Sequence, residues 1–518
     1  MFKKYIKGYK YNIKRKEFHM VVIKEHNIDV LNLKLNMDVL SKISGNIAYK
    51  FSILPFNIQE NKVCILASKE IKESTIDYIK FIYKKDLKVY IVDKKEVLMA
   101  VKKYHKKMIL HGAIKEIEKN NMLYKNLDTN KNLTDIENAP AVKIANTIIN
   151  EAIAMRASDI HIEPFEEKVI IRFRIDGSLI IYTELSKEVY IFLLSRIKIM
   201  ADMDISKKFM PADGKIYYKL EEKEFDLRVS TVPTVYGEKV VIRILHKDGE
   251  KLSLNALGFQ KESCNLIKKC IGKPNGMILV AGPTGSGKST TLYSLLKELN
   301  EKECNITTIE DPVEYNMPFV NQININNKVG LTFAQGLRSI LRQDPDIIMI
   351  GEIRDSETAK IAVKAAMTGH LVFSTLHTKD SIGTILRLMD MGVENYLLAD
   401  TLLTVISQRL VRKICNHCKE SYKPSKEEIR VLDLEEGQLL FRGRGCTYCN
   451  KTGYSSRTVL YEILVIGEKE REFIRGIGSV YKASYGKNLS LGKSLRNRGI
   501  QLVKKGITTY EEIIKHII

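Results

Sequence analysis

An apolar run, a glycine-rich segment and an amphipathic stretch follow one another near the middle of the 518-residue chain. The run Met277–Ala281 is apolar throughout, which is typical of a strand buried on both faces of a parallel sheet. Beyond the glycine-rich segment, Leu292, Leu295, Leu296 and Leu299 follow the i, i+3, i+4, i+7 spacing of one helix face. The pattern predicts a buried strand, a tight turn and a helix in that order.

Alternating apolar and polar residues predict paired strands earlier in the chain. Residues 169–175 alternate, and Asp176-Gly177 is a strong hairpin signal before the next apolar residues. Residues 225–231 and 240–245 alternate in the same way. The polar faces of these strands carry Arg172, Arg174, Arg228 and Arg243. These arginines either line a solvated strand face or reach a neighbouring subunit's nucleotide as arginine fingers, which stabilise charge in phosphoryl transfer.

The chain should contain several modules, because 518 residues are too many for a single hydrophobic core. Short apolar runs and a helix from about Lys95 to Tyr104 predict a small α/β module, and the polar residues after it predict a flexible linker. The predicted boundaries are 1–105 for the N-terminal partner-binding module, 106–138 for the linker, 139–250 for a second module, and 251–518 for the last domain, which includes a cysteine-containing segment at 411–463.

The formal net charge is +21, and the basic residues are scattered along the sequence. Solvated lysine-rich faces explain this balance best, ahead of an anionic membrane surface or nucleic acid. No RNA-recognition or helix-turn-helix signature is visible, so we expect no direct nucleic-acid binding. We also see no signal peptide and no apolar run of the ~18–20 residues that span a bilayer. We therefore expect a cytoplasmic protein that touches membranes through partners.

The glycine-rich segment is a complete P-loop, since it has the Gly-x-x-x-x-Gly-Lys-Ser pattern between the predicted strand and helix. A chance glycine-rich turn would lack these flanking elements. Its glycines let backbone N–H groups converge on phosphate oxygens. Lys288 supplies a charge for the β- and γ-phosphates, and Ser289 offers a hydroxyl to Mg²⁺. The expected nucleotide contacts are Gly282, Pro283, Thr284, Gly285, Ser286, Gly287, Lys288, Ser289 and Thr290.

Two later apolar strands end in acidic residues. The first ends at Glu310, where RecA-like ATPases place the general base for the attacking water, so we assign that role to Glu310. The second is followed by Gly351 and Glu352, a Walker B position with glycine where many P-loop proteins have aspartate. We expect Glu352 to act on Mg²⁺ or water. The alternative is a pair of surface acids, which the pairing of two such strands with one P-loop disfavours.

Histidines and arginines near these strands are further candidates. His370 and His377 frame a third apolar strand, and together they indicate a sensor of the γ-phosphate, although a lone histidine is usually structural. Arg338 and Arg342 flank a helix turn before the second acidic strand.

Two Cys-x-x-Cys pairs, Cys415 with Cys418 and Cys446 with Cys449, follow the predicted core. Each pair presents two thiolates, so together they supply a tetrahedral Zn²⁺ site. Disulfides fit a reducing compartment poorly, and a duplicated redox motif is unusual. Four thiolates leave no open position for water, so the site would be structural.

The order of these motifs resembles the secretion ATPases of the type II secretion and type IV pilus assembly class. Two departures stand out: Ser456 occupies a position where the family often has glycine, and the N-terminal region lacks the Arg-Leu-Gly-x-x-Leu signature with which some members bind cyclic di-GMP. The segments that carry the resemblance are Ser158–Pro164, the P-loop, Glu310–Glu314, Leu341–Asp355, Thr368–His377, the cysteine pairs and Ser494–Glu512.

The resemblance implies an α/β multidomain fold with a RecA-like P-loop ATPase core. A PAS-like α/β module and an N-terminal α/β module would precede this core, and a tetracysteine zinc-binding segment and a helical C-terminus would complete it. The enzyme would be a homohexamer that binds ATP, Mg²⁺ and Zn²⁺. Each nucleotide would lie between the P-loop domain and the second module of the same chain. The family's arginines correspond to Arg228 and Arg243 in that module and to Arg338 and Arg342 in the core.

The resemblance also implies mechanical work at the cytoplasmic face of the membrane. Hydrolysis would turn a polytopic inner-membrane platform protein that adds pilin subunits to a fibre. The N-terminal module would bind other cytoplasmic or membrane assembly proteins. A pilus-extension motor is the leading interpretation, and a type II secretion ATPase that powers pseudopilus assembly and protein export is its sibling. A DNA-uptake or nucleic-acid motor and an inactive scaffold are the alternatives, and the intact Lys288, Ser289, Glu310 and Glu352 argue against the scaffold.

Overall fold

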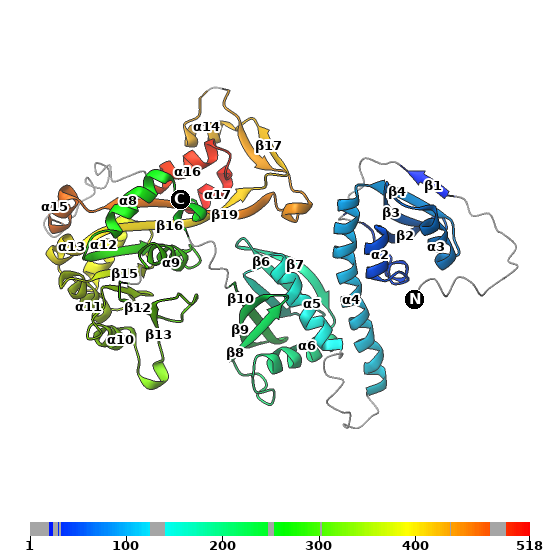
Figure 1. The fold of residues 1–518 in the computed structure, drawn as a ribbon, viewed down its shortest axis with the longest axis horizontal. Helices are drawn as coiled ribbons and strands as arrows, with labels where there is room; N and C mark the ends of the chain where they lie inside the picture. The colour runs from blue at the N-terminus through cyan, green and yellow to red at the C-terminus, as the bar shows by residue number, and fades with distance from the viewer. Residues whose placement is uncertain are drawn as a thin grey trace, which may run out of the picture. The chain divides into compact units, whose positions relative to one another are not determined.

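The computed structural model describes residues 20–23, 30, 33–124, 140–246, 253–300, 303–435, 437–476 and 494–517 (Figure 1). They form two compact units, of which the first extends to Ile244 and the second begins at Leu245. Both units combine helices with β-sheets, which agrees with the α/β multidomain fold predicted from the sequence.

The N-terminal module of the first unit is a four-stranded sheet in the order β1-β4-β3-β2, with helices packed on it. β2 and β3 form an antiparallel hairpin, and Glu60 and Asn61 at its tip have φ angles of 48° and 60°. Two such residues are typical of a type I′ turn, whose twist matches that of the flanking strands. The elements are β1 (Met20–Ile23), α1 (Met37–Leu40), α2 (Gly45–Phe51), β2 (Ile53–Gln59), β3 (Lys62–Ser68), α3 (Glu73–Tyr83) and β4 (Leu87–Val92).

One long helix, α4 (Lys94–Tyr124), contributes to two hydrophobic cores of this unit. Its first half packs into the core of the N-terminal module, and its second half packs into the core of the next module. The linker predicted for 106–138 is therefore helical as far as Tyr124, because its apolar residues keep helical spacing, and the rest of it lies outside the described residues. The buried residues of α4 are Val97, Ala100, Val101, Tyr104, Leu110, Ala113 and Ile117.

The second module is a six-stranded sheet in the order β7-β6-β5-β10-β9-β8. The predicted hairpin is confirmed, since Asp176 and Gly177 have φ angles of 48° and 88° between β6 and β7. The apolar residues of the strands face α5 and α6 and form the core. The elements are α5 (Pro140–Ala154), β5 (Asp159–Pro164), β6 (Val169–Ile175), β7 (Ser178–Leu185), α6 (Lys187–Met200), β8 (Ala212–Leu220), β9 (Lys223–Thr234) and β10 (Gly237–His246).

The second unit is built on a seven-stranded sheet in the order β13-β12-β14-β15-β11-β16-β19. Its strands pair in parallel except β19, which is antiparallel to β16. The central strand β11 (Gly276–Ala281) is buried throughout, as predicted. Met277 and Leu279 belong to the core on one face of the sheet, whereas Ile278 and Val280 belong to the core on the other.

Helices cover both faces of this sheet (Figure 1). The other elements of the layered part are α7 (Leu254–Leu257), α8 (Lys261–Ile271), α9 (Lys288–Leu299), β12 (Ile306–Glu310), β13 (Val320–Asn324), η4 (Asn327–Val329), α10 (Phe333–Ile340), β14 (Ile347–Ile350), α11 (Ser356–Met367), β15 (Leu371–Leu376), α12 (Ser381–Asp390), α13 (Asn395–Thr401), β16 (Leu402–Ile414), β19 (Tyr454–Val465) and α15 (Glu468–Gly476).

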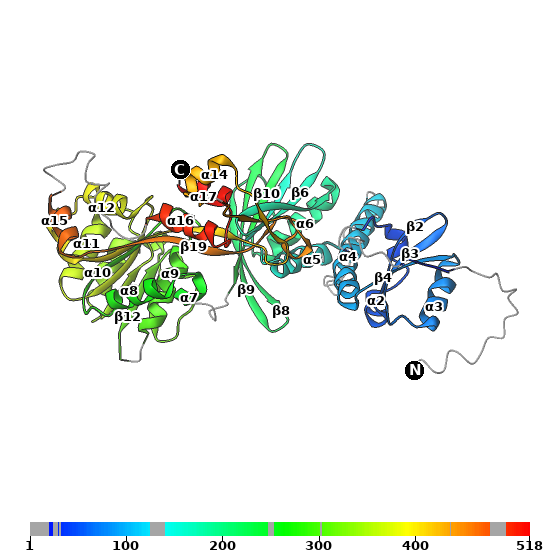
Figure 2. The same cartoon turned by 90° about the horizontal axis from the view of Figure 1, so that it is seen from above.

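The long strands β16 and β19 extend from the sheet toward a smaller subdomain that contains the cysteines and the last helices (Figure 2). Its core packs Val411 and Leu460 of these strands against Leu502 and Ile513 of the terminal helices. The helical C-terminus predicted from the sequence is thus confirmed. The elements are β17 (Lys419–Tyr422), α14 (Lys426–Leu432), β18 (Leu440–Gly443), η5 (Thr447–Cys449), α16 (Leu495–Lys504) and α17 (Tyr510–Ile517).

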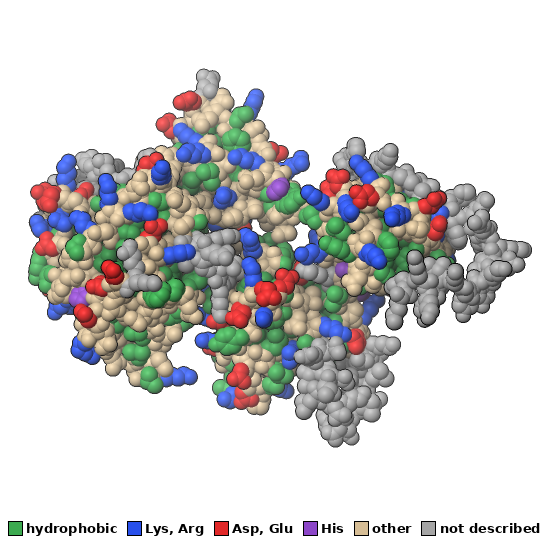
Figure 3. All heavy atoms as spheres, in the orientation of Figure 1, with side chains coloured by type: hydrophobic (Ala, Val, Ile, Leu, Met, Phe, Trp, Pro, Cys, Tyr) green, Lys and Arg blue, Asp and Glu red, His purple; other side chains and the backbone are tan. Residues whose placement is uncertain are grey.

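Charged side chains of both signs are mixed on the face shown in Figure 3, where Lys and Arg lie among Asp and Glu. This distribution matches the scattered basic residues of the sequence. Within the described part of the chain, every helix is too short or too polar to cross a bilayer.

Candidate functional site

The predicted P-loop connects β11 to α9, as expected from the hydrophobic pattern. Gly282, Gly285 and Gly287 have φ angles of +153°, +76° and +85°, a region that other residues adopt with strain. A Cβ atom at Gly282 would also lie 2.4 Å from the backbone oxygen of Gln408. The loop therefore needs glycine both for its conformation and for its close contact with β16. Pro283, Thr284 and Gly285 are exposed, Ser289 and Thr290 are half-buried, and Ser286 is buried.

Lys288, the first residue of α9, is buried beside the loop. Its Nζ atom donates hydrogen bonds to the carbonyl oxygens of Gly282 and Pro283, at 3.0 and 3.1 Å. Burial lowers the pKa of Lys288, and the negative charge of Glu352 partly offsets this effect. The lysine is thus held inside the loop and interacts electrostatically with the predicted Walker B acid.

Backbone contacts bring the predicted motifs to one edge of the sheet. The parallel strands β11, β12, β14 and β15 all end there. The N–H of Gly282 donates to the oxygen of Leu376 at 3.2 Å, and the N–H of Gly351 donates to the oxygen of Ile309 at 2.8 Å. Thr375 Oγ1 in turn donates to the oxygen of Gly351 at 2.7 Å. The P-loop, both acidic strand ends and the end of the histidine-framed strand therefore meet.

Glu352 and His377 contact each other at this edge. His377 Nε2 lies 3.3 Å from a carboxylate oxygen of Glu352, and Arg354 donates a hydrogen bond to the other oxygen. Burial alone would raise the pKa of Glu352, but Arg354 and His377 outweigh it and lower the pKa. Glu352 is therefore a carboxylate at neutral pH.

Glu310 has a different environment, because its carboxylate lies in a buried hydrogen-bond network. Tyr293 of α9 donates to Oε2, while Thr308 Oγ1 and Gln322 Nε2 donate to Oε1 at 2.6 and 3.3 Å. The Tyr293 hydroxyl also accepts the N–H of Glu314 at 3.2 Å. Glu310 thus ties the P-loop helix to the segment after β12.

The backbone of β12 leaves little room for a side chain at Gly351, the Walker B position where aspartate is usual. A Cβ atom at Gly351 would lie 3.3 Å from Cα of Glu310 and from the oxygen of Ile309. These distances are tighter than ordinary van der Waals contact, and both atoms belong to the backbone. A larger residue at 351 would press on the strand that carries Glu310.

The structure does not bring His370 to this edge. His370 precedes β15, whereas His377 follows it, and the six residues between them span about 20 Å. The Nδ1 atom of His370 instead contacts the oxygen of Ala365 at 3.0 Å. The prediction that both histidines sense the γ-phosphate of this P-loop is therefore wrong for His370, because the two ends of a strand lie at opposite edges of the sheet.

Arg338 and Arg342 make contacts within their own region. Arg338 pairs with Glu357 at the start of α11, and Arg342 donates to the oxygen of Arg338 at 2.8 Å and to Ser339 Oγ at 3.3 Å. Among the described residues, these contacts do not link either arginine to the P-loop.

Arg228 and Arg243 belong to the first unit, on the polar face of the second module. Arg243 Nε donates to Asp159 Oδ1 at 3.0 Å, and Arg174 Nε lies 3.5 Å from Asp159 Oδ2. The Nε atom of Arg228 is buried and has no hydrogen-bond partner among the residues that the structure describes. Arg172 pairs with Glu163 on the same face. The strand pattern therefore gathers Arg172, Arg174 and Arg243 around the two buried acids Asp159 and Glu163.

Two polar residues beside the P-loop, Tyr293 and Gln408, belong to no motif of the sequence. Tyr293 lies among the leucines of the buried face of α9, so the sequence pattern does not distinguish it from an ordinary core residue. Gln408 interrupts the apolar run of β16, and a buried amide within an apolar strand is the signal that could have found it.

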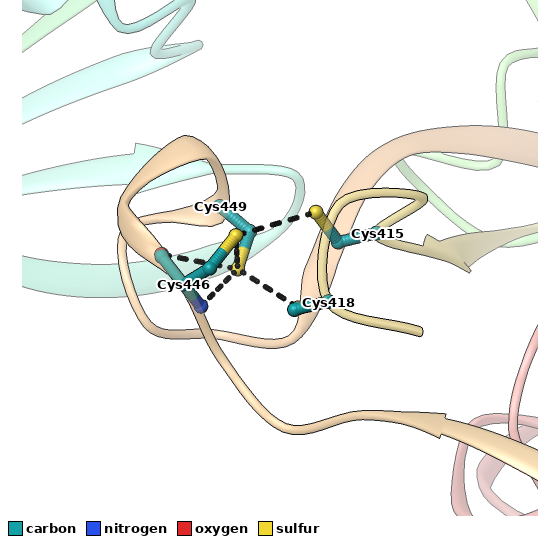
Figure 4. A group of neighbouring side chains, drawn as sticks. All are labelled: Cys415, Cys418, Cys446 and Cys449. Atoms are coloured by element: carbon teal, nitrogen blue, oxygen red, sulfur yellow. Dashed lines mark hydrogen bonds between the residues drawn. The ribbon is translucent and has the colours of Figure 1, made fainter. Parts of the chain in front are cut away.

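The four predicted zinc ligands converge from two loops (Figure 4). The Sγ–Sγ distances are 3.8 Å for Cys415–Cys446, 3.8 Å for Cys418–Cys449 and 3.7 Å for Cys446–Cys449. Four thiolates about 2.3 Å from a tetrahedral Zn²⁺ would be about 3.8 Å apart, so the cluster fits this ion.

Backbone groups complete the surroundings of the cysteine cluster. The N–H groups of Cys446 and Gly453 donate to Cys449 Sγ at 3.1 and 3.3 Å. Burial alone would raise the pKa of Cys449, but these donors outweigh it and lower the pKa to about 7. Thiolate ligands are commonly oriented by such donors. The rings of His417 and Tyr448 stack 3.9 Å apart between the two loops.

Comparisons with known proteins find similar sequences over most of the chain. Residues 134–515 match the family model described as type II/IV secretion system protein. Type II secretion system protein E of Pseudomonas aeruginosa is 46% identical over 381 residues, which are 73% of this chain and 76% of that protein. The type IV pilus assembly ATPase PilB of Thermus thermophilus is 40% identical over 474 residues, which are 90% of this chain and 53% of that protein.

A solved structure supports the fold. The ATPase DotB of Legionella pneumophila superposes with a TM-score of 0.54 at 22% identity, over 72% of this chain and 94% of that chain. At this level of identity the likeness concerns the fold, and it confirms the predicted ATPase architecture.

Proposed function

Because this chain belongs to the type II/IV secretion system protein family, we propose that it is an ATPase that powers pseudopilus assembly and protein export in a type II secretion system. Support for type II secretion over the pilus-extension motor, which the motifs alone favour, comes from sequence identity. The secretion relative is 46% identical and matches over 76% of its length, compared with 40% and 53% for the pilus relative.

The observation that carries the proposal is the convergence of Lys288, Glu352 and His377 at the edge where four parallel strands end. A lysine inside a glycine-rich loop, opposite a carboxylate, is the arrangement that phosphoryl transfer needs. Lys288 would neutralise the β- and γ-phosphates, and backbone N–H groups of the loop would hold their oxygens. Bound Mg²⁺, held in part by Ser289, would add charge neutralisation.

We assign water activation to Glu352 rather than to Glu310, to which the motifs point. Glu310 is buried and both of its carboxylate oxygens accept hydrogen bonds from neutral side chains. The oxygens of Glu352 contact Arg354 and His377, but Glu352 is partly exposed and acts on Lys288. A general base needs a lone pair within reach of the water that it deprotonates. Glu310 would then position the P-loop helix, and His377 would orient Glu352 and respond to the γ-phosphate.

Arginines from the second module would complete the nucleotide site. Arg228 and Arg243 remain our candidates for arginine fingers, which can be worth about 10³–10⁵ in turnover. Asp159 would hold Arg243 ready, since it accepts a hydrogen bond from its guanidinium. This arrangement requires closure of the second module on the P-loop domain. We propose a homohexamer, and light scattering of the nucleotide-bound protein that finds only monomers would exclude it.

The cysteine cluster would hold one structural Zn²⁺, because four thiolates leave no position for substrate water. The motor would act at the cytoplasmic face of the membrane on a polytopic platform protein, and the N-terminal module would bind further assembly proteins. Pilus assembly is the second candidate, and one observation favours it: the pilus relative aligns over 90% of this chain, whereas the secretion relative aligns over 73%.

An experiment in the native host separates the two candidates. The chromosomal gene is deleted and complemented with the wild type or with Lys288→Ala, and both exported proteins and surface fibres are measured. Loss of export with normal fibres supports type II secretion. Loss of fibres with normal export contradicts it and supports pilus assembly, and normal export and fibres contradict both.

A further inference from the structure

Two adjacent polar residues of β16, Gln408 and Arg409, are buried directly beside the P-loop. Their exposed fractions are 1% and 8%, in a strand whose central residues are otherwise mostly apolar. Burial of a polar side chain costs free energy unless hydrogen bonds compensate for it. The hydrogen-bond partners of Gln408 and Arg409 therefore indicate their structural role. The motifs identified in the sequence assign no role to either residue.

Gln408 contacts both the loop and its helix. Its Nε2 atom donates to the carbonyl oxygen of Ser286 at 2.8 Å, and its Oε1 atom accepts a hydrogen bond from Thr291 Oγ1 at 2.9 Å. A Cβ atom at Gly282 would lie only 2.4 Å from the backbone oxygen of Gln408, so the loop and this residue are in close contact. The residue therefore contacts the beginning, the middle and the helical end of the phosphate-binding segment, and it fixes the direction of the loop's backbone dipoles.

Arg409 contacts the other half of the site. One guanidinium nitrogen donates to the oxygen of Lys379 at 2.6 Å, and the other donates to the oxygen of Gln408 at 2.9 Å. Lys379 lies two residues after His377, in the segment between β15 and α12. No carboxylate among the described residues forms an ion pair with Arg409. Glu462 and Asp380 act on its positive charge without a direct ion pair, and this charge in turn acts on Lys288.

Ser407 adds a third link, since its Oγ atom donates to the oxygen of Lys379 at 3.3 Å. The chain after His377 is thus attached to β16 by two donors, and the P-loop is attached to the same strand by Gln408. Three consecutive residues of one buried strand therefore form hydrogen bonds with both the P-loop and the segment after His377.

We propose that Gln408 and Arg409 are positioning residues of the ATPase reaction, which couple the P-loop to the segment that carries His377. This inference rests on the proposed ATP hydrolysis. Gln408 holds the phosphate-binding backbone in place before nucleotide arrives, and so acts mainly on nucleotide affinity. Arg409 holds the segment after His377 and adds positive potential near the phosphates, and so acts mainly on turnover. A nucleotide that moves one half of the site therefore moves the other through β16.

The test compares Gln408→Leu, Arg409→Met and Arg409→Lys with the wild type. We expect Gln408→Leu to weaken binding of a fluorescent ADP analogue and to raise KM by about tenfold, because two buried hydrogen bonds are lost. Arg409→Met should lower kcat by about tenfold with a smaller change in KM, and Arg409→Lys should recover part of that loss because it keeps the charge. Gln408→Glu keeps the size and places an acceptor against the Ser286 oxygen, so it should resemble Gln408→Leu even if the leucine variant folds poorly.

Thr404→Val is the matched control, because Thr404 is a fully buried residue of the same strand that donates to the oxygen of Leu464 at 2.9 Å. It should lose stability without changing kcat or KM. Wild-type kcat, KM and analogue binding in both Gln408→Leu and Arg409→Met would overturn the inference, and so would changes that Thr404→Val reproduces. The outcome is distinct from failure of the proposed function: a wild type that binds the analogue but does not hydrolyse ATP refutes the ATPase, while the binding data still test Gln408.

Discussion

The Nε2 atom of His377 lies 3.3 Å from a carboxylate oxygen of Glu352, and the two residues stand at the ends of neighbouring parallel strands. This contact places a histidine and an acid beside the buried Lys288 of the P-loop. Glu310 has different partners from Glu352, because its carboxylate accepts a hydrogen bond from Tyr293.

Replacing Glu352 or Glu310 by glutamine should affect ATP turnover and protein stability to different extents. Glu352→Gln should keep nucleotide binding and lose at least about 100-fold in turnover, because an amide cannot accept the proton of water. Glu310→Gln should lose less turnover and more thermal stability, because it disturbs the buried network around Tyr293. Steady-state ATP hydrolysis and thermal melting of both variants measure these effects. A larger loss of turnover in Glu310→Gln than in Glu352→Gln would show that Glu310 is the general base.

Zinc should be present at about one ion per chain in freshly purified, reduced protein, as measured by elemental analysis. Cys446→Ser should lose the metal and destabilise the surrounding subdomain. Cys304→Ser is the control, since Cys304 lies outside the cluster, and it should keep the metal. Zinc-free wild-type protein would show that the thiols serve another purpose.

Ser456 has a φ angle of +69°, which is a strained conformation for a residue other than glycine. It lies in β19 at an irregularity in the pairing with β16, where the family often has glycine. Ser456→Gly should therefore stabilise the protein by about 0.5–1 kcal/mol, as urea denaturation would measure. The neighbouring Ser455→Gly should have the opposite sign. A destabilising Ser456→Gly would mean that the serine's own contacts outweigh the backbone strain.

The packing of α17 on β16 should weaken in acid. Burial alone would raise the pKa of Glu512, but hydrogen bonds from Arg412 and Lys515 outweigh it and lower the pKa to about 2. A carboxylate with a depressed pKa in the folded state stabilises the fold above its ordinary pKa of 4.5, and this contribution is lost as the pH falls from about 4.5 toward 2.

Thermal melting of the wild type and of Glu512→Gln between pH 7 and pH 3 measures this contribution. The variant should be less stable at pH 7, and the difference should narrow as the pH falls below about 4.5. A constant difference over this range would show that Glu512 titrates normally in the folded protein.

Local patterns predicted the elements that carry the P-loop, because strand, turn and helix signals all lie between Gly276 and Leu299. The cysteine cluster was also predictable, since metal-ligand spacing is local within each pair. The sequence could not show which of His370 and His377 lies at the P-loop edge, because that requires the direction of β15 relative to β11. Nor could it join Gln408 to the P-loop, since 117 residues separate it from Thr291.

Helix α4 illustrates a different limit. Its second half has a polar composition, which favours a linker, yet Leu110, Ala113 and Ile117 are buried against the core of the second module. Helices draw most of their stability from tertiary packing of an apolar face rather than from composition. The sparse apolar spacing is visible in the sequence, but the surface that covers it is not.

Steady-state ATP hydrolysis by wild-type protein and by Lys288→Ala tests the central claim most directly. Lys297→Ala, an exposed lysine of the same helix, is the control. We predict Mg²⁺-dependent hydrolysis by the wild type and by Lys297→Ala, and no measurable hydrolysis by Lys288→Ala, because the charge that neutralises the β- and γ-phosphates is gone. Equal turnover in Lys288→Ala and the wild type would contradict the assignment of this P-loop as the site of ATP hydrolysis.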